Sequence, residues 1–528
     1  MKKVLYVGDF SQLPTGYGQY ARHLLPWLSK KYEVAELACY VSDGDPRIKD
    51  CGWKVFPNKP TNPRELELYN SNPSGEYGDY RFNSTLLNWK PDYVINISDP
   101  WAFEYVVRSP LRDYFSHILM PTVDAFPNMP DWLDYYAQAD ALLAYSEFGR
   151  DSILKQLPNR DIQIASPAVN KLFTPLKFED KLELKEKFSL PKYNIIGTVM
   201  RNQPRKLYSD LFYAFSKADT DALLYCHTGF PDLGWNIPDL LMEHGITNRV
   251  LFSYKCKTCQ SISIRFFSDS VCHCQNCGNF TNSIVGVSNG FNDDELSNVY
   301  RVMDGYIQCS KNEGFGIPLI EAAASGVMIS AINYSAMASI IDNLDAIPIK
   351  VESYEKEAST GRNMARPDIK SLIFTIEFFG NQEREDLFDS GVQISSVCRS
   401  MYNWESVGLS WEKTIETAIP PKKKWDSPPE VLHPQPLCDM IGPMQQANFL
   451  IGSVLCKPQI IGGQLWRRLV KDLTYNSRVG SYGTFYFNEM SEKDSLKQLP
   501  FSYEDAYNEM CILREYYNVW EGHRISTL

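Results

Sequence analysis

Two glutamates lie eight residues apart in the stretch KNEGFGIPLIEAAASG at residues 311–326. The pattern predicts a strand that ends before Glu313, a glycine-containing turn, and a helix. The free N–H groups and partial positive charge of a helix N-terminus suit a phosphate, and Gly314 and Gly316 let the backbone approach it closely. Glu313 follows a strand at its carboxyl end, where α/β folds bind ligands. Glu321 lies about one turn into the helix and can accept two hydrogen bonds from a vicinal diol such as a ribose.

A second group of residues has the spacing of a metal site. Five of the 13 cysteines fall between residues 256 and 277, and four of them form two C-x2-C knuckles separated by fourteen residues. These four are Cys256, Cys259, Cys274 and Cys277. Each knuckle can chelate one tetrahedral ion with Zn–S bonds of about 2.3 Å. Cys272 and His273 are spare donors, and Cys272 could replace Cys274. The spacing resembles a zinc ribbon, and four thiolates close the coordination sphere, so we predict a structural zinc.

The framework that must position these residues is predicted from apolar runs. Residues 3–8 are typical of a buried parallel strand, and a glycine loop, a helical pattern and another strand follow, as in a doubly wound α/β unit. Further strands of this series are predicted at 91–97, 117–123 and 139–146. A second series starts with a strand at 193–200 and continues to about residue 400. Residues 56–80 are rich in Pro, Asn, Ser and Gly, which predicts a long surface loop.

Composition narrows the class of protein. The formal net charge of -11 argues against a broadly basic nucleic-acid-binding surface. No run approaches the ~18 apolar residues of a membrane span. Asp9 interrupts the N-terminal apolar run too early for a signal peptide, so we expect a cytoplasmic protein.

The string E-G-F-G-x-P-x-x-E-A-x-A-x-G resembles the signature of the retaining GT-B glycosyltransferases of family four, also called glycosyl transferases group 1. The resemblance implies an α/β protein of two Rossmann-like lobes that face a central cleft. It also implies that Glu313 contacts hydroxyls of the donor sugar and that Glu321 binds the ribose. Gly314, Phe315 and Gly316 are the matching donor-binding turn. Enzymes of this fold do not generally need a catalytic metal.

The stretch GTVMRNQPRKLYSDLFYAF at 197–215 resembles the family's strand followed by an Arg and a Lys. The matching positions are Arg201 and Lys206, and Arg205 is an alternative for the lysine because the loop length varies. In the family these cations hold the donor diphosphate. A diphosphate leaving group needs its developing charge neutralised, which paired cations do. The alternative is an ordinary solvated basic turn.

The first lobe carries further candidates. TGYGQYARHL at 15–24 resembles the family's glycine loop, which closes on the donor phosphate, so Gly16 and Gly18 are candidates for donor binding; a plain tight turn is the alternative. Many family members have a His where this chain has Asp124, which could still hydrogen-bond a sugar or acceptor hydroxyl. Asp99, in NISDPW, is a possible acceptor residue or a loop cap.

The predicted zinc ribbon interrupts the second lobe between two segments that are nearly contiguous in the family and lie beside the nucleotide base. The ribbon therefore touches the acceptor, caps the donor base, or only staples a long insertion. We predict an N-terminal acceptor lobe at 1–175, a C-terminal nucleotide-sugar lobe at 190–400, a zinc-ribbon insertion at 254–282, a crossover helix at 401–419, a proline-rich linker at 420–436 and a C-terminal extension of unknown role at 437–528.

The function these patterns predict is transfer of a sugar, with retention by front-face displacement, from a nucleotide diphosphate sugar to an unknown acceptor. UDP is slightly preferred over GDP, and the acceptor could be a glycan, a small molecule or a nucleic acid. One alternative is a phage-type DNA-base glycosyltransferase, since zinc ribbons often bind nucleic acids. Another is a non-catalytic zinc-ribbon binding protein on a GT-B scaffold. An epimerase or phosphorylase is disfavoured by the spacing of the two glutamates.

Overall fold

The computed structural model describes residues 1–72, 74–286 and 289–425. The predicted extension at 437–528 and all but the first six residues of the predicted linker at 420–436 lie outside the described residues. Contacts divide the chain into two compact units, each of which is described by itself. Unit 1 comprises Met1–Pro121, Tyr135–Leu142 and the chain from Thr414 onward, and unit 2 comprises Thr122–Asp134 and Leu143–Lys413. No helix of the described residues is long and apolar enough to cross a membrane.

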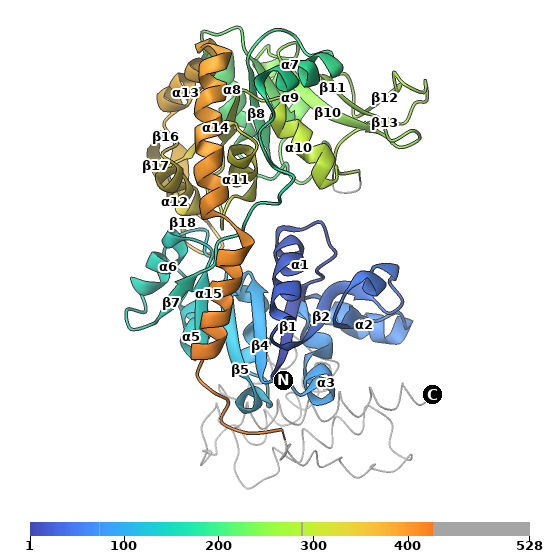
Figure 1. Ribbon diagram of the computed structural model, residues 1–528, viewed down its shortest axis with the longest axis vertical. Coiled ribbons are helices and arrows are strands. Elements are labelled where there is room, and N and C mark those ends of the chain that lie inside the picture. Colours follow the sequence, from blue (N-terminus) through green and yellow to red (C-terminus); the bar gives the residue numbers. More distant parts are fainter. Residues whose placement is uncertain (73, 287–288, 426–528) are drawn as a thin grey trace, which may run out of the picture. The chain divides into compact units, whose positions relative to one another are not determined.

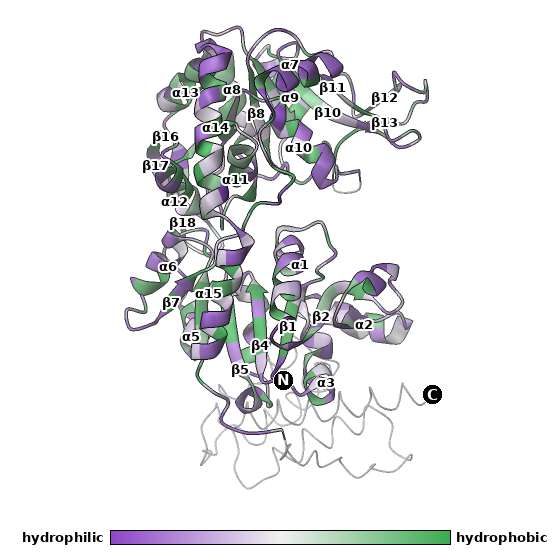
Figure 2. Cartoon of the chain, in the orientation of Figure 1, coloured by the Kyte–Doolittle hydropathy of each residue, from purple (hydrophilic) through white to green (hydrophobic). Residues whose placement is uncertain are grey.

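The first sheet has seven strands in the order β3-β2-β1-β4-β5-β6-β7, and its pairings from β3 through β6 are parallel (Figure 1). Its strands are apolar because both faces of such a sheet are covered, and β1 and β5 are coloured mainly hydrophobic in Figure 2. The elements of this region are β1 (Lys3–Asp9), α1 (Gly16–Leu28), β2 (Glu33–Ser42), β3 (Lys54–Lys59), α2 (Pro63–Ser71), α3 (Asp79–Trp89), β4 (Tyr93–Ser98), α4 (Glu104–Val107), β5 (Ser116–Pro121), α5 (Pro130–Gln138), β6 (Ala141–Ala144), α6 (Glu147–Leu154) and β7 (Ile162–Ile164).

The second sheet has the order β12-β13-β10-β9-β8-β14-β15-β16, and β11 pairs with β10. Its elements are β8 (Ile195–Val199), α8 (Tyr208–Lys217), β9 (Leu223–His227), α9 (Ile237–Glu243), β10 (Val250–Cys256), β11 (Ile262–Phe266), β12 (Val271–Cys272), β13 (Asn282–Ile284), α10 (Asp293–Arg301), β14 (Gly305–Gln308), α11 (Ile317–Ala324), β15 (Met328–Ile332), α12 (Ser335–Leu344) and β16 (Ile347–Ile349). The strands from β10 to β16 along this order pair in parallel, whereas β11, β12 and β13 pair antiparallel.

The remaining described elements are α7 (Phe178–Lys187), which precedes β8, a small antiparallel sheet of β17 (Val351–Lys356) and β18 (Asn363–Pro367), and three helices, α13 (Ile369–Asn381), α14 (Arg384–Met401) and α15 (Trp404–Thr417). The predicted crossover helix at 401–419 corresponds to α15, which begins at Trp404, and its crossover role stays a prediction.

The strands β1 to β6 of the first sheet have the order 3-2-1-4-5-6 of a Rossmann fold. The six parallel strands of the second sheet, numbered along the chain without β11, β12 and β13, have the same order. The order reverses between β1 and β4 in the first sheet and between β8 and β14 in the second. Ligands of doubly wound proteins bind outside the carboxyl ends of the strands at such switch points. The residues that follow β8 and β14 are therefore the place to look for a ligand site in unit 2.

The prediction of a long surface loop at residues 56–80 is wrong. This stretch contains the end of β3, all of α2 and the start of α3. Pro63 begins α2, where a proline costs nothing because the first N–H groups of a helix have no intrahelical partner. The turn-forming residues that suggested a loop lie at the ends of short helices and not between distant elements.

Candidate donor site and metal centre

The loops after β8 and β14 are joined by backbone hydrogen bonds. Leu207 N donates to Cys309 O at 2.9 Å, and Lys311 N donates to Arg205 O at 2.9 Å. These bonds place the basic end of the first loop beside the residues that follow β14. The two predicted motifs, which are more than 100 residues apart in the sequence, are thereby brought together at the switch point.

Glu313 is the centre of this group and is 7% exposed. One carboxylate oxygen pairs with the Lys206 ammonium and accepts from Gln308 Nε2 at 2.8 Å. The other oxygen accepts from Arg205 Nη1 at 3.0 Å. The Glu313 N–H donates to Ser335 Oγ at 2.9 Å, so the backbone of the turn is also fixed. The carboxylate is thus held by two cations and an amide.

Electrostatics follow from this pairing. Burial raises the pKa of Glu313, but the charges of Lys206 and Arg205 outweigh burial and hold that pKa well below its usual range. Burial lowers the pKa of Lys206 to about 8 against the opposing effect of Glu313. At neutral pH the ionised Glu313 carboxylate therefore lies between the two cations Lys206 and Arg205. The three groups together carry one excess positive charge, which suits an anionic ligand.

Arg201 and Arg205 do not have the same surroundings. Arg201 Nε and Nη2 each donate to an oxygen of Asp232 at 3.1 Å, and its side chain is about half exposed. Arg205, the alternative cation of the sequence comparison, is the one that contacts Glu313. Lys206, for which Arg205 was the alternative, pairs with the same carboxylate, and the role of Lys206 in donor binding stays a prediction. The role of Arg201 in donor binding stays a prediction.

Glu321 lies in the first turns of α11 and is 8% exposed. Its Oε2 accepts from Tyr300 Oη at 2.8 Å, and α10 supplies this tyrosine. Burial raises the pKa of Glu321 to about 7, although the Tyr300 hydrogen bond opposes the shift. The second oxygen has no hydrogen-bond partner among the described residues, so the group retains capacity to accept from a diol.

The glycine turn before α11 has two different constraints. A Cβ on Gly314 would lie 2.3 Å from Thr122 Cγ2, so only glycine fits beside the loop after β5. Gly316 caps α11 with φ +105°, a left-handed conformation that favours glycine. Phe315 between them is buried, with its ring centroid 5.7 Å from that of Tyr402.

Asp124 belongs to unit 2 and contacts the same turn. Its Oδ2 accepts from Asn312 Nδ2 at 2.6 Å, and its Oδ1 pairs with Arg362. Asp124, which stands in place of the family's His, therefore contacts the residue before Glu313 and is paired with a cation that the sequence did not suggest. Its contact with a sugar or acceptor hydroxyl stays a prediction.

The candidates of unit 1 lie at the other switch point. Gly16 begins α1, and Gly18 donates its N–H to Thr15 Oγ1 at 3.0 Å. A Cβ on Gly18 would lie 2.7 Å from Leu13 O, so packing already requires a glycine there. Asp99 follows β4 and accepts from Tyr17 Oη at 3.0 Å. Donor contacts of Gly16 and Gly18 and an acceptor role for Asp99 remain predictions.

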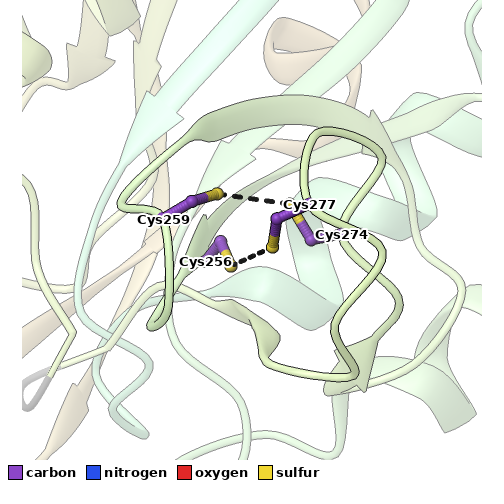
Figure 3. A group of neighbouring side chains, drawn as sticks. All are labelled: Cys256, Cys259, Cys274 and Cys277. Atoms are coloured by element: carbon purple, nitrogen blue, oxygen red, sulfur yellow. Dashed lines mark hydrogen bonds between the residues drawn. The ribbon is translucent and has the colours of Figure 1, made fainter.

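The four cysteines converge from two turns, one between β10 and β11 and the other between β12 and β13 (Figure 3). Their sulfur atoms all lie within 4.8 Å of one another, and the Cys256–Cys277 and Cys259–Cys274 separations are both 3.7 Å. A tetrahedral zinc with Zn–S bonds of about 2.3 Å needs sulfur atoms about 3.8 Å apart. The donor set therefore fits a zinc ion.

Each of the four sulfurs also has a hydrogen-bonding neighbour, as thiolates around a metal require. The Thr281 hydroxyl lies beside the Cys256 sulfur, and the Ser261 hydroxyl lies beside the sulfurs of Cys259 and Cys274. The amides of Asn276 and Asn279 donate to the sulfurs of Cys259 and Cys277, and all these separations are 3.0 to 3.5 Å. Cys272 lies outside the cluster, where its sulfur accepts from Arg265 and Asn282 at 3.6 and 3.5 Å. The alternative that Cys272 replaces Cys274 is therefore wrong.

Several residues of this site carried no readable signal in the sequence. Gln308, Ser335 and Tyr300 are polar residues of the second α/β series, and each contacts a glutamate that lies outside its own element. Arg362 lies in a hairpin that was not predicted at all. Only the fold shows which buried polar side chain faces which carboxylate.

Comparisons with known proteins agree with this geometry. Residues 273–359 match the family model described as glycosyl transferases group 1. No curated protein shows a significant match to the sequence. Among solved structures, sucrose-phosphate synthase (tll1590) from Thermosynechococcus elongatus is similar, with a TM-score of 0.57, 14% identity, and coverage of 79% of this chain and 98% of that chain.

Two other similar structures hold nucleotide ligands. Anabaena Alr3699/HepE in complex with UDP and glucose has a TM-score of 0.53 at 11% identity, and the similarity covers 79% of this chain and 100% of that chain. The E. coli protein described as trehalose-6-phosphate bound with UDP-2-fluoro glucose has a TM-score of 0.52 at 12% identity, with the same two coverages of 79% and 100%. The chain has the GT-B fold, and the family match together with this fold supports a glycosyltransferase.

Proposed function

We propose that this protein is a retaining glycosyltransferase that binds a nucleoside diphosphate sugar at the switch point between β8 and β14. The observation that carries the proposal is Glu313, buried and held between Arg205 and Lys206 at the carboxyl ends of two parallel strands. A purely structural ion pair needs one cation, whereas this site has an excess positive charge that a diphosphate would neutralise.

The parts of the donor have matching groups. Arg205 and Lys206 bind the diphosphate together with the N-terminus of α11, and Arg201 joins them if the diphosphate draws it away from Asp232. Glu321 binds the ribose hydroxyls, and Glu313 contacts hydroxyls of the sugar. UDP is the slightly preferred nucleotide. The similar structures that hold UDP or a UDP-sugar support this choice.

The reaction forms one bond and breaks another on the same face of the sugar. The acceptor hydroxyl oxygen attacks the anomeric carbon while the bond from that carbon to the phosphate oxygen breaks. The acceptor proton passes to the departing phosphate oxygen, so no separate base is required. The cations stabilise the negative charge that grows on the diphosphate, which is where preorganised charge accelerates a reaction most.

Zinc in this proposal is structural. Cys256, Cys259, Cys274 and Cys277 would hold it with no open coordination position for substrate. Strand β10 passes from the parallel part of the second sheet into the hairpin that carries Cys256, so the ion stabilises an extension of that sheet. The acceptor, which is a glycan, a small molecule or a nucleic acid, is not specified by these contacts.

Thermal-shift titration with UDP, GDP and ADP tests the donor site. A ligand that binds only the folded state stabilises it by about 2.7 kcal/mol at 100 times its dissociation constant. We expect one nucleotide to raise the melting temperature of the wild type, and Glu321→Ala to abolish that shift. Glu183→Ala, the same change on the exposed side of α7, is the matched control and should keep it.

Two outcomes would count against the proposal. The absence of a shift with any of the three nucleotides would remove the donor site itself. A shift that persists undiminished in Glu321→Ala would place the nucleotide elsewhere in the molecule.

A further inference from the structure

The β17–β18 hairpin contacts both loops of the proposed sugar site. Asn363 N donates to Phe126 O at 2.9 Å, and Ala365 N donates to Lys311 O at 3.1 Å. Tyr334 Oη adds a second link, since it donates to Asn363 O at 2.7 Å and lies 3.2 Å from Phe126 N, which donates to it. The hairpin therefore holds the loop after β5 and the loop after β14 against one another within unit 2.

Arg362, at the end of this hairpin, is 8% exposed and has all three sides of its guanidinium occupied. Nη1 pairs with Asp124, Nη2 lies 3.1 Å from Glu357 Oε2, and Nε donates to Thr360 Oγ1 at 3.1 Å. The guanidinium also lies over the ring of Trp132, 4.9 Å from its centroid. A planar guanidinium with this many fixed partners has one orientation. Its hydrogen bond to Asp124 therefore has a fixed direction and orients the carboxylate.

Asn312 fixes the other side of the same carboxylate. Its Nδ2 donates to Asp124 Oδ2 at 2.6 Å, which also determines the orientation of the amide, because the flipped amide would turn its oxygen toward the carboxylate. The backbone carbonyl oxygen of Asn312 accepts from Arg205 Nη1 at 2.9 Å. Contacts therefore run from Arg362 through Asp124 and Asn312 to the cation that holds Glu313.

We propose that Arg362 is a positioning residue of the sugar-transfer step: it fixes the Asp124 carboxylate in the one orientation in which Asp124 accepts a hydrogen bond from a hydroxyl of the donor sugar. This inference rests on the proposed function and deepens it, since it names how the chain orients the sugar without the family's His. Arg362 lies beyond residue 359, where the match to the family model ends.

The chemistry of the cluster explains why a lysine would not serve. Asp124 and Glu357 are two carboxylates that share a single guanidinium. An ammonium group on a flexible stem cannot bond both carboxylates and Thr360 in fixed directions, whereas the rigid fork of arginine can. Loss of the fork would leave Asp124 attached to Asn312 alone and free to turn away from the sugar.

The test compares Arg362→Gln with Glu357→Gln in the full-length chain. Glu357→Gln removes the other carboxylate partner of Arg362 and leaves the contact with Asp124, so it is the matched control. Binding of UDP, UDP-glucose, UDP-N-acetylglucosamine, GDP and GDP-mannose is measured for each variant, together with slow release of nucleoside diphosphate from the preferred sugar nucleotide in water.

In Arg362→Gln we expect affinity for the nucleoside diphosphate to stay within about twofold. The ratio of the affinity for the sugar nucleotide to the affinity for its nucleoside diphosphate should fall about tenfold, and so should the rate of nucleoside diphosphate release. Tenfold is the loss expected from one misplaced hydrogen bond to a charged group. Asp124→Asn should reproduce this split, and the double variant should be no worse than either single variant. Glu357→Gln should resemble the wild type. Arg362→Lys replaces Arg362→Gln if the latter does not fold.

The outcomes separate the two proposals. If Arg362→Gln binds the sugar nucleotide and releases nucleoside diphosphate as the wild type does, this inference is overturned and the proposed function stands. The same holds if Arg362→Gln and Glu357→Gln lose affinity for the sugar nucleotide equally. An equal fall in affinity for the nucleoside diphosphate and for its sugar overturns it as well, because it indicates a general structural role. If wild type binds none of the five ligands, the proposed function fails and this inference fails with it.

Discussion

The two sheets share one topology but carry opposite charges at their switch points. In the first sheet, Asp9 ends β1 and Asp99 follows β4, and each accepts from a hydroxyl, at 2.6 Å from Thr15 and 3.0 Å from Tyr17. In the second sheet, the loops after β8 and β14 bring two cations onto Glu313. Topology therefore supplies two equivalent crevices, and side chains make only one of them suitable for a diphosphate.

This difference shows how one strand order serves two ligands. A diphosphate carries negative charge that carboxylates repel and cations neutralise, so the proposed donor would bind at the second sheet. A neutral acceptor with hydroxyl groups needs hydrogen-bond acceptors, which the carboxylates of the first sheet provide. Function thus follows from the residues at the strand ends and not from the fold, which is the same in both regions.

The largest effect is expected at Glu313. Glu313→Gln leaves Arg205 and Lys206 without their shared carboxylate, so the free energy of unfolding should fall by about 3 kcal/mol. Release of nucleoside diphosphate from a sugar nucleotide should fall about 100-fold, as when a preorganised polar group is removed. Urea unfolding and steady-state product release measure the two quantities.

The matched change in the first sheet sharpens that prediction. Asp99→Asn keeps an oxygen that accepts from Tyr17 Oη and removes only the negative charge of the side chain. Its effect on unfolding should be below about 1 kcal/mol. Equal losses in the two variants would contradict the account of two differently charged switch points.

The second-largest effect is expected at the four-cysteine cluster, whose strands extend only the second sheet. Cys274→Ser should abolish binding of one zinc per chain and lower the melting temperature, because a structural zinc contributes directly to folding. Cys272→Ser should keep both the zinc and the melting temperature, since Cys272 lies outside the cluster. Metal content by mass spectrometry of the native protein gives the answer, and zinc loss in Cys272→Ser alone would refute the ligand set.

A pH-dependent effect is expected at Glu321, whose pKa burial raises to about 7 from an ordinary 4.5. Between these values the folded state holds a proton that the unfolded state has released, so stability falls as pH rises through 7. Glu321→Gln removes that cost, on the order of 2 kcal/mol, and should melt higher than the wild type at pH 8 but similarly at pH 4.5. Melting temperatures at the two pH values test the sign.

The same group should make nucleotide binding pH-dependent, since only the ionised carboxylate accepts from both ribose hydroxyls. Affinity of the wild type should rise as pH increases through 7, and Glu321→Gln should lose this dependence. In the first sheet, burial also raises the pKa of Glu36 to about 7, although Ser11 and Trp53 donate to it. Glu36→Gln is therefore the control, and the pH dependence of nucleotide affinity should survive in it.

The smallest effect is expected at the strand ends of the first sheet. Tyr17→Phe removes the hydroxyl that donates to Asp99 and should change nucleotide affinity by less than about twofold, because no diphosphate binds there. Isothermal titration with the nucleotide that shifts the wild type most measures this. A tenfold loss would place the donor at the first sheet and invert the comparison.

Much of this organisation could be predicted from the sequence. Apolar runs identify β1, β8 and β14 because buried parallel strands are continuously hydrophobic. The cysteine spacing identifies the four cysteines whose sulfur atoms converge, because a knuckle is a local structure. In both cases the residues that determine the feature are close together in the chain.

The loop prediction at residues 56–80 fails locally, because turn-forming residues also occur at the ends of short helices. The predictions for the site are incomplete because they concern contacts between distant residues. Arg205 was only an alternative to Lys206 in the sequence, but both contact Glu313, and this depends on a bond between two loops, Lys311 N to Arg205 O. The pairing of Asp124 with Arg362 joins residues 238 positions apart. Such pairs leave no local pattern, since each residue alone resembles an ordinary surface charge.

A crystal structure of the complex with UDP, GDP or ADP, whichever stabilises the wild type most, tests the central claim most directly. The account predicts the diphosphate within hydrogen-bonding distance of Arg205 and Lys206 and the ribose hydroxyls on Glu321. A nucleotide bound instead beside Asp9 and Asp99, or one whose diphosphate contacts neither Arg205 nor Lys206, would contradict it.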